Sequence, residues 1–417
     1  MFSPKIRRRK DGKNLFFVTL PSQLFEIDCQ LEIMDKIKIF VFACCLSMLA
    51  ACHSSDPEEV EWGNRTVLVY MAADNSLSTD GIKNIELMKK GMKEIDGRVI
   101  IYYDPANEVP HLMKLERGRL DTLAVYEEEN SASPQVLARV VEEVRRSYPA
   151  DSYGLVLWSH GMGWLPAGVS SPRSLQMQRD SRMPRTKYFG EDLDLGAEGG
   201  PVYMDIREIA DALPGGFEFI LFDACFMSSI EVLYELKDKA DYVIASPAEI
   251  ISDGFPYDKI MPYLGGGEQN LIQMCQEFYD YYANHPNGGY YLSATIALVK
   301  MAELQDMARI VSEILEGKTS FSSEVWKYPL SRGGLPDVFF DFADYIHEMA
   351  TEEQRMAFDH QLSKLVRYRK ATEEFFGTPI PGDKYSGLSV YIPYPQWPQL
   401  NNKYKGLAWM KAVYGGQ

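Results

Sequence analysis

Apolar runs separated by polar turns are the main pattern along residues 65–300. Continuous apolar runs of this kind predict strands that are buried on both faces of a sheet. Polar or glycine-rich residues follow the runs and predict the turns that end the strands. The predicted strands are Arg65–Ala73, Arg98–Asp104, Tyr153–Gly161, Phe217–Phe222, Asp241–Glu249 and Tyr290–Lys300.

Amphipathic stretches lie between several of these runs. A helix is predicted from about Ile82, and apolar residues at helical spacing predict a second helix across Val136–Val144. A hairpin is predicted from His111–Glu116 and Asp121–Tyr126. Strands that alternate with helices predict an α/β fold, with an open, mainly parallel sheet and helices on both faces.

The last third of the chain is less regular. Helices are predicted near Glu303–Leu315 and Glu352–Arg367, a late strand across Tyr385–Pro395, and a closing helix across Tyr404–Val413. We therefore expect one domain over residues 65–300 and a smaller C-terminal domain over residues 301–417.

A short apolar segment near the N-terminus predicts export. A basic stretch begins at Met34, and the apolar core Ile39–Ala51 is too short to span a bilayer but suits a signal peptide. Small residues before Cys52 and a polar tether after it (52–64) resemble a bacterial lipoprotein signal, with Cys52 as the lipidated residue. The alternatives are an ordinary secretory signal or a buried apolar strand. The expected location is the cell envelope, periplasmic or surface-exposed, with a lipid anchor.

The 33 residues before Met34 do not fit a signal peptide, which should begin the chain. We expect translation to start at Met34 and residues 1–33 to be an extension outside the protein. The alternative is a basic arm for nucleic acid around Arg7–Lys10. Residues 1–33 carry a net charge of +2 and residues 34–51 one of +1, so the remainder of the −16 chain carries −19. Such an acidic surface argues against a nucleic-acid partner.

Few cysteines remain once the leader is set aside. Cys29, Cys44 and Cys45 precede Cys52, which leaves Cys225 and Cys275 in the folded part. An exported chain with two thiols and no disulfide framework is unusual.

Cys225 lies where an apolar strand passes into the amphipathic helical stretch of Phe217–Leu236. A helix N-terminus lowers the pKa of a thiol, and a strand end exposes it, so Cys225 is a candidate nucleophile. The alternative is a buried structural thiol, because free cysteine packs as a small apolar residue.

One of the six histidines also lies at the end of a predicted strand. The chain contains His53, His111, His160, His285, His347 and His360, and only His160 is embedded at a predicted strand end. Gly161 and Gly163 follow it and leave amides open to a substrate oxygen. Because the carboxyl ends of parallel strands share one edge, His160 and Cys225 are expected to meet there. A satisfied core histidine is the alternative. No spacing of metal ligands is visible.

The segments around these two residues resemble the clostripain family of cysteine peptidases, relatives of caspases, legumains and gingipains. "LVLWSHGMGW" around His160 and "ILFDACFMSSIEVLYEL" around Cys225 carry the resemblance. "VLVYMAADNSL", "VIASPAEIISDGFPYD" and "GLSVYIP" extend it, in the right order, over roughly Arg65–Tyr414. The family's "DACLM" stands here as "DACFM", a hydrophobic exchange. The resemblance implies a caspase-like form of the predicted sheet.

The resemblance also assigns roles. It implies that Cys225 is the nucleophile, that His160 transfers the proton, and that the amides of Gly161 and Cys225 stabilise the oxyanion, with no third orienting residue. The family cleaves after Arg or Lys, which needs a buried carboxylate in the S1 pocket. Asp223 is the position indicated, and Glu249 and Asp253 are weaker candidates. Asp223 could also cap the following helix.

The long polar segment between His160 and Cys225 predicts self-processing. Members of the family are often activated by self-cleavage between the catalytic residues, after a basic residue. The candidate positions are Arg173, Arg179, Arg182, Arg185 and Lys187. The alternative is a solvated surface loop.

The sequence thus predicts an exported, lipid-anchored cysteine endopeptidase that cleaves protein or peptide substrates after Arg or Lys. No cofactor is expected, and calcium use is not readable from the residues. One alternative is a catalytically silent lipoprotein of the same fold that binds substrates. A thiol-dependent transferase is a third possibility, but neither a GxGxxG motif nor a P-loop is present.

Overall fold

The computed structural model describes residues 62–166, 204–318, 324–329, 338–395 and 397–415. The chain divides into two compact units, Met1–Glu59 and Val60–Gln417. All described residues belong to the second unit. Cys52, the predicted signal segment and the extension before it therefore lie outside the described residues.

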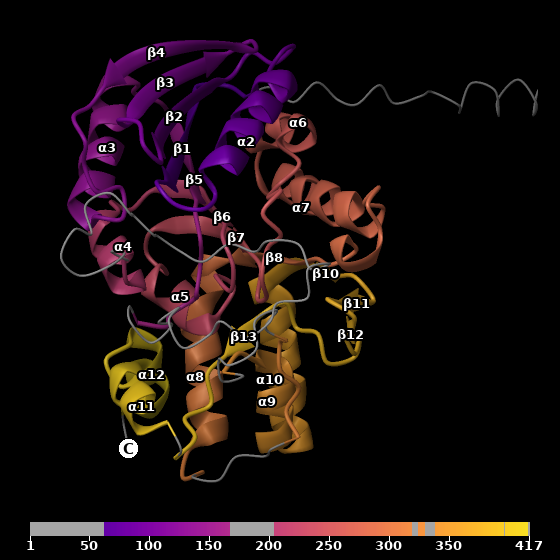
Figure 1. The fold of residues 1–417 in the computed structure, drawn as a ribbon. Helices are drawn as coiled ribbons and strands as arrows, with labels where there is room; N and C mark the ends of the chain where they lie inside the picture. The colour runs from indigo at the N-terminus through magenta and orange to yellow at the C-terminus, as the bar shows by residue number, and fades with distance from the viewer. Residues whose placement is uncertain (1–61, 167–203, 319–323, 330–337, 396, 416–417) are drawn as a thin grey trace, which may run out of the picture. The chain divides into compact units, whose positions relative to one another are not determined.

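A mixed sheet forms the centre of this unit (Figure 1). In the described residues its nine strands follow the order β10-β8-β7-β6-β5-β1-β2-β3-β4. The strands are β1 (Arg65–Ala73), β2 (Arg98–Pro105), β3 (His111–Glu116), β4 (Arg119–Val125), β5 (Ser152–Trp158), β6 (Phe217–Asp223), β7 (Ala240–Ala245), β8 (Thr295–Lys300) and β10 (Val366–Ala371).

The middle of the sheet is parallel and its two edges are antiparallel. Strands β7, β6, β5, β1 and β2 pair in parallel, whereas β3 and β4 at one edge and β8 and β10 at the other pair antiparallel. Every residue of β1 is buried, which explains the apolar run Val67–Ala73 after its first two residues. The predicted mainly parallel α/β sheet and its first hairpin are confirmed.

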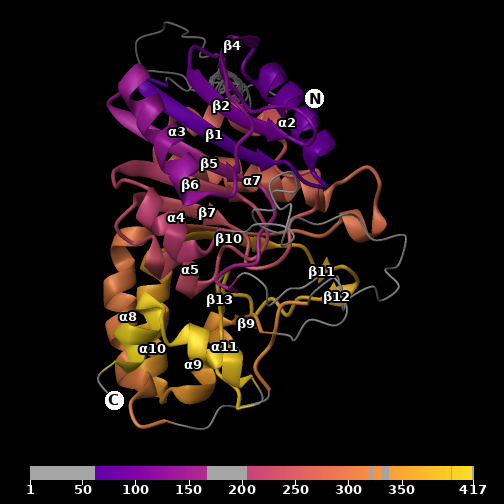
Figure 2. The same ribbon diagram turned by 60° about the vertical axis from the view of Figure 1, so that its left-hand side comes forward.

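Helices cover both faces of the sheet (Figures 1 and 2). Helices α2, α6 and α7 lie on one face, and α3, α4 and α5 lie on the other. Their bounds are α2 (Ser78–Gly91), α3 (Pro134–Ser147), α4 (Ile206–Ala212), α5 (Ile230–Glu235), α6 (Tyr257–Ile260) and α7 (Glu268–Ala283). Short 3-10 turns are η2 (Met261–Gly265), η3 (Gly289–Tyr291) and η4 (Met301–Glu303).

Helix α3 illustrates how local sequence determines these elements. The Ser133 side chain accepts a hydrogen bond from the Gln135 amide, and Pro134 occupies the first turn, where its missing N–H costs nothing. Leu137, Val140 and the residues at the same spacing face the sheet and are buried. The apolar stripe therefore stabilises the helix through packing on the sheet.

The C-terminal third continues the same unit. Strand β10 pairs with β8, so the chain on both sides of residue 300 contributes to one sheet. The domain boundaries expected from the sequence stay predictions. The remaining helices are α8 (Leu304–Leu315), α9 (Phe342–Met349), α10 (Glu352–Leu365), α11 (Pro398–Tyr404) and α12 (Ala408–Tyr414).

The late strand predicted across Tyr385–Pro395 is much shorter in the structure. Only β13 (Ser389–Val390) is a strand, and it pairs with β9 (Phe340–Asp341). A second small pair joins β11 (Glu374–Phe375) to β12 (Thr378–Pro379). In the described parts of the chain, no helix is long and apolar enough to cross a bilayer.

Candidate active site

Strand register brings His160 and Cys225 to equivalent positions at the carboxyl edge of the sheet. Trp158 of β5 pairs with Asp223 of β6. His160 and Cys225 each lie two residues beyond this pair, on the loops that leave the two strands. The expectation that both residues lie at one edge of the sheet agrees with this register.

The two loops touch through Gly161. A Cβ atom built on Gly161 would lie 2.3 Å from the Cys225 carbonyl oxygen and 2.6 Å from the Cys225 amide nitrogen. Real Cβ atoms do not approach other atoms so closely, so only glycine fits between the loops. The backbones of the two predicted oxyanion donors are therefore in direct contact.

Cys225 is buried, which differs from the exposed thiol expected from the sequence. Its side chain is covered by the loop after β7: the Ile250 amide donates a hydrogen bond to Sγ at 3.1 Å, and Sγ lies 3.6 Å from the Ile250 carbonyl oxygen. The expected helix start is also displaced. Helix α5 begins at Ile230 with Ser229 as its cap, so Cys225 precedes the first turn of the helix.

The residue after Cys225 has an unusual backbone. Phe226 has φ of 60°, a left-handed conformation that is costly for a bulky side chain. Its ring stacks on Phe339 with centroids 4.4 Å apart, and its amide donates to the Ala248 carbonyl at 2.9 Å. These contacts hold the sharp turn that follows Cys225.

His160 is buried and contacts the loop that follows β1. Its Nε2 atom lies 3.2 Å from the Ser76 hydroxyl. Sequence reasoning missed Ser76. The available signal was its place in the "MAADNSL" segment, because β1 is the neighbour of β5 and its carboxyl end shares the edge with His160.

Asp223 lies directly beneath this site and is fully buried. Its Oδ2 atom accepts hydrogen bonds from the Tyr257 hydroxyl at 3.0 Å and from the Phe255 amide at 3.4 Å. Phe255 lies between β7 and α6 and Tyr257 is the first residue of α6, whereas Ser229 caps α5. The N-terminal cap of α5 is thus Ser229 rather than Asp223.

The weaker candidates differ in exposure. Glu249 is buried, whereas the Asp253 side chain is 38% exposed. Tyr282 connects Asp253 to the centre of the site. Burial raises the pKa of its hydroxyl well above the usual range, and the charges of Asp253, Asp223 and Cys225 raise it further. The hydroxyl of Tyr282 donates to the carbonyl of Gly254, the residue after Asp253, at 2.7 Å.

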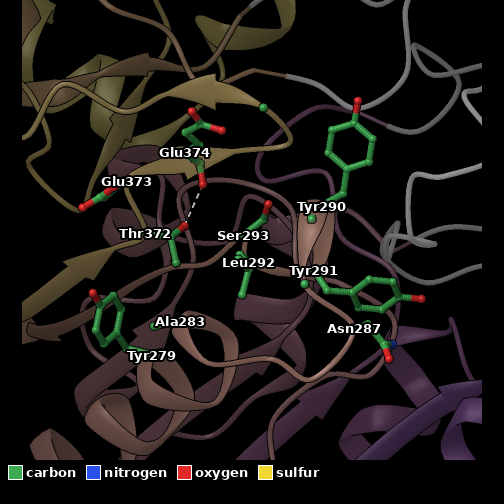
Figure 3. Close-up of a pocket in the computed structure, with 13 residues that line it drawn as sticks. Tyr279, Ala283, Asn287, Tyr290, Tyr291, Leu292, Ser293, Thr372, Glu373 and Glu374 are labelled. Atoms are coloured by element: carbon green, nitrogen blue, oxygen red, sulfur yellow. Dashed lines mark hydrogen bonds between the residues drawn. The ribbon is translucent and has the colours of Figure 1, made fainter.

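Two cavities of several hundred Å³ among the described residues have neither His160 nor Cys225 in their lining. One, of about 760 Å³, lies between α7, η3 and residues 372–377 (Figure 3). The other, of about 500 Å³, lies between α2, α6 and α7, and Asp253 and Tyr281 line it. Among the residues that the structure describes, no three His, Cys, Asp or Glu side chains are placed to hold a metal ion.

Comparison with known proteins identifies the family of the chain. The sequence profile of the clostripain family matches residues 69–378. The chain belongs to the clostripain family. Clostripain from Hathewaya histolytica is 29% identical over 244 residues, which cover 49% of this chain and 43% of that protein. The chain thus matches less than half the length of this curated relative.

Solved structures of clostripain-family proteases share the fold. An inactive zymogen C11 protease from Parabacteroides distasonis is 36% identical in sequence. The match covers 84% of this chain and 98% of that protease, with a TM-score of 0.71. A secreted C11 cysteine protease from Bacteroides thetaiotaomicron, in complex with an irreversible peptide inhibitor, is 28% identical. It covers 85% of this chain and 99% of its own, also with a TM-score of 0.71. The predicted family, caspase-like fold and cysteine-peptidase class are confirmed.

The individual clostripain-family roles stay predictions. The five processing candidates lie within residues 167–203, outside the described residues; they are Arg173, Arg179, Arg182, Arg185 and Lys187. Phe226 was missed as a site residue, because no sequence signal marks a phenylalanine for a left-handed backbone.

Proposed function

We propose that this clostripain-family chain is an exported endopeptidase that cleaves after Arg or Lys with Cys225 and His160. The close contact between Gly161 and the Cys225 backbone is the observation that carries the proposal. It brings the loop of the proton acceptor and the loop of the nucleophile together at the carboxyl edge of the sheet, where ligands of α/β folds bind.

Catalysis would proceed through a covalent acyl-enzyme. His160 accepts the thiol proton of Cys225, and the thiolate attacks the scissile carbonyl carbon. The amides of Gly161 and Cys225 donate to the resulting oxyanion. His160 then returns the proton to the leaving amine, which leaves a thioester on Cys225. Water, deprotonated by His160, hydrolyses the thioester and regenerates the thiol.

We further propose that Asp223 and Asp253 select a basic P1 residue. Asp223 is fully buried and supplies the negative charge at the bottom of the S1 pocket. Asp253 is partly exposed and supplies a negative charge at the entrance of the pocket. A desolvated guanidinium or ammonium group must be paired with a carboxylate. Asp223 accepts a hydrogen bond from the amide of Phe255, two residues after Asp253, and this contact supports a shared pocket.

Self-activation is the third part of the proposal. The burial of both His160 and Cys225 and the identity of one relative as an inactive zymogen support a closed state that needs cleavage. Wild-type protein should migrate as two fragments under denaturing conditions and Cys225→Ala as one. Active protein that stays intact would refute self-activation. Fragments in the Cys225→Ala variant would assign the cut to another protease.

Lipidation at Cys52 is the fourth part, and the apolar segment before this cysteine supports it. A fatty-acid analogue fed to a bacterial host should label the wild type and leave Cys52→Ala unlabelled. An unlabelled wild type would refute the lipid anchor.

A panel of peptides that differ only at P1 tests the main function. Purified protein should cleave the Arg and Lys peptides and spare the Ala and Glu peptides. If no peptide is cleaved, even after limited proteolysis, the alternative of a catalytically silent lipoprotein that binds substrates gains support.

A further inference from the structure

His285 has a well-defined environment that the catalytic mechanism does not use. The residue follows α7, and its side chain is only 3% exposed. Its ring stacks on Tyr291, with centroids 4.8 Å apart and planes inclined by 15°, and lies nearly parallel to Tyr282 at 5.9 Å. Tyr281 meets the ring edge-on at 5.0 Å. Three aromatic rings therefore fix the imidazole in one orientation.

Hydrogen bonds determine which ring nitrogen carries the proton. The Asn287 amide donates to Nδ1 at 3.3 Å, so Nδ1 is an acceptor. The proton of the neutral ring therefore lies on Nε2. Nε2 lies 3.4 Å from Asp253 Oδ2 and 3.2 Å from the Tyr281 hydroxyl. The hydrogen bond of Nε2 is therefore to the Tyr281 hydroxyl, and the Asp253 carboxylate lies beside it at ion-pair distance.

The backbone of the same region reinforces this pairing. Tyr291 and Asn287, two neighbours of the His285 ring, line the cavity in Figure 3. Behind them, the Tyr282 hydroxyl donates to the Gly254 carbonyl at 2.7 Å. Helix α7 therefore holds the backbone next to Asp253, and His285, just beyond the end of the helix, contacts the Asp253 side chain.

Asp253 belongs to the loop that covers the nucleophile. Ile250 contacts Sγ of Cys225, and the Gly254 amide closes a turn on the Ile251 carbonyl at 2.9 Å. Gly254 has φ of 70°, a conformation that suits glycine. The turn therefore carries Asp253 within a few residues of the thiol contact.

We propose that His285 is a positioning residue for substrate selectivity, which holds the Asp253 carboxylate toward a basic P1 side chain. This inference rests on the proposed function and adds a residue to it. The Asp253 side chain is partly exposed, so without the contact to Nε2 it would turn toward solvent. A carboxylate that must be ordered again at each encounter binds a cation less tightly.

Two substitutions test the contribution of Nε2 separately from that of Nδ1. His285→Gln places an amide N–H near the position of Nε2, whereas His285→Asn retains only an acceptor near Nδ1. Loss of the polar contact between the ring and the carboxylate corresponds to roughly a tenfold change in binding. We expect KM for an Arg peptide to rise by about tenfold in His285→Asn, with kcat within about twofold, and His285→Gln to stay close to wild type.

A double-mutant cycle tests whether His285 acts through Asp253. In the Asp253→Asn background, His285→Asn should cause no further rise in KM. His347→Asn is the matched control, because His347 Nε2 also pairs with a carboxylate, Asp359, at 2.7 Å in the α9–α10 region. This control should leave KM unchanged.

Several outcomes would overturn the proposal. Equal KM values for His285→Asn and wild type would do so, as would a loss of kcat alone or an undiminished effect in the Asp253→Asn background. If His285→Asn does not fold, His285→Phe replaces it, because Phe keeps the ring stack and lacks the donor. A wild type that shows no preference for Arg or Lys would refute the proposed function itself, independently of the His285 variants.

Discussion

Gly161 lies so close to Cys225 that a Cβ atom at position 161 would come within 2.3 Å of the Cys225 carbonyl oxygen. The contact joins the loop after β5 to the loop after β6, and it sets the spacing of the two proposed oxyanion donors. A side chain there must move backbone atoms, since no flexible group lies in the way.

Gly161→Ala should therefore disrupt catalysis. A displacement of about 1 Å at the reacting groups costs roughly a hundredfold in rate, and we expect kcat/KM for an Arg peptide to fall by about that factor. Gly382→Ala is the control, because a Cβ there meets nothing within 4 Å. Gly161→Ala with wild-type activity would contradict the proposed geometry.

Ser76 provides a milder test of His160. The Ser76 hydroxyl lies 3.2 Å from Nε2, and a hydrogen bond of this kind contributes about 1 kcal/mol, or about fivefold. Ser76→Ala should lower kcat by about this factor and leave KM for Arg peptides nearly unchanged. A selective change in KM would instead place Ser76 in substrate binding.

Asp223→Asn tests the proposed P1 pocket. The substitution keeps the size of the side chain and removes the charge, and an unpaired buried cation costs roughly 3–5 kcal/mol. We expect kcat/KM for Arg and Lys peptides to fall about a hundredfold to several thousandfold. If Asp223→Asn keeps its preference for Arg and the preference is lost in Asp253→Asn or in a Glu249 variant, the carboxylate that pairs with the P1 cation is Asp253 or Glu249 instead.

Much of the architecture could be predicted from the chain itself. Buried strands such as β1 and β6 contain the apolar runs Val67–Ala73 and Phe219–Phe222, because a parallel sheet covered on both faces has no polar side. The placement of His160 and Cys225 at one edge of the sheet could also be predicted, since parallel strands share a carboxyl edge.

Burial and local geometry could not be predicted in this way. Cys225 is covered by Ile250, whose position depends on the tertiary path of the loop after β7. The late strand shrinks to Ser389–Val390, because side chains such as Asp341 hold the chain before it: Asp341 Oδ2 accepts from the Ser386 amide and hydroxyl. These interactions join residues far apart in sequence, and no local pattern records them.

Glu231 should make the stability of the fold pH-dependent. The side chain is fully buried in α5, and Oε1 accepts from the Tyr391 amide at 2.8 Å. Burial raises the pKa of the Glu231 carboxyl to about 7, well above its usual value of 4.5. The folded state therefore binds this proton more tightly than the unfolded state, and stability falls as pH rises from about 4.5 through 7.

Glu231→Gln should remove this contribution. The variant stays neutral, so its free energy of unfolding relative to wild type should improve by up to about 3 kcal/mol between pH 4.5 and pH 8. Denaturant unfolding at several pH values measures the difference. Glu235→Gln, on the same helix, is the control; its carboxylate accepts from the Ala408 amide at 2.6 Å. Parallel pH profiles for wild type and Glu231→Gln would contradict the assignment.

Covalent trapping of the nucleophile tests the central claim most directly. Active protein is treated with an irreversible peptide inhibitor that carries Arg at P1, and the adduct is mapped by mass spectrometry. The account predicts one adduct per chain, on Cys225, with no adduct and no peptide cleavage in Cys225→Ala and little of either in His160→Ala. An adduct on another residue, or a Cys225→Ala variant that keeps most of the wild-type turnover, would contradict it.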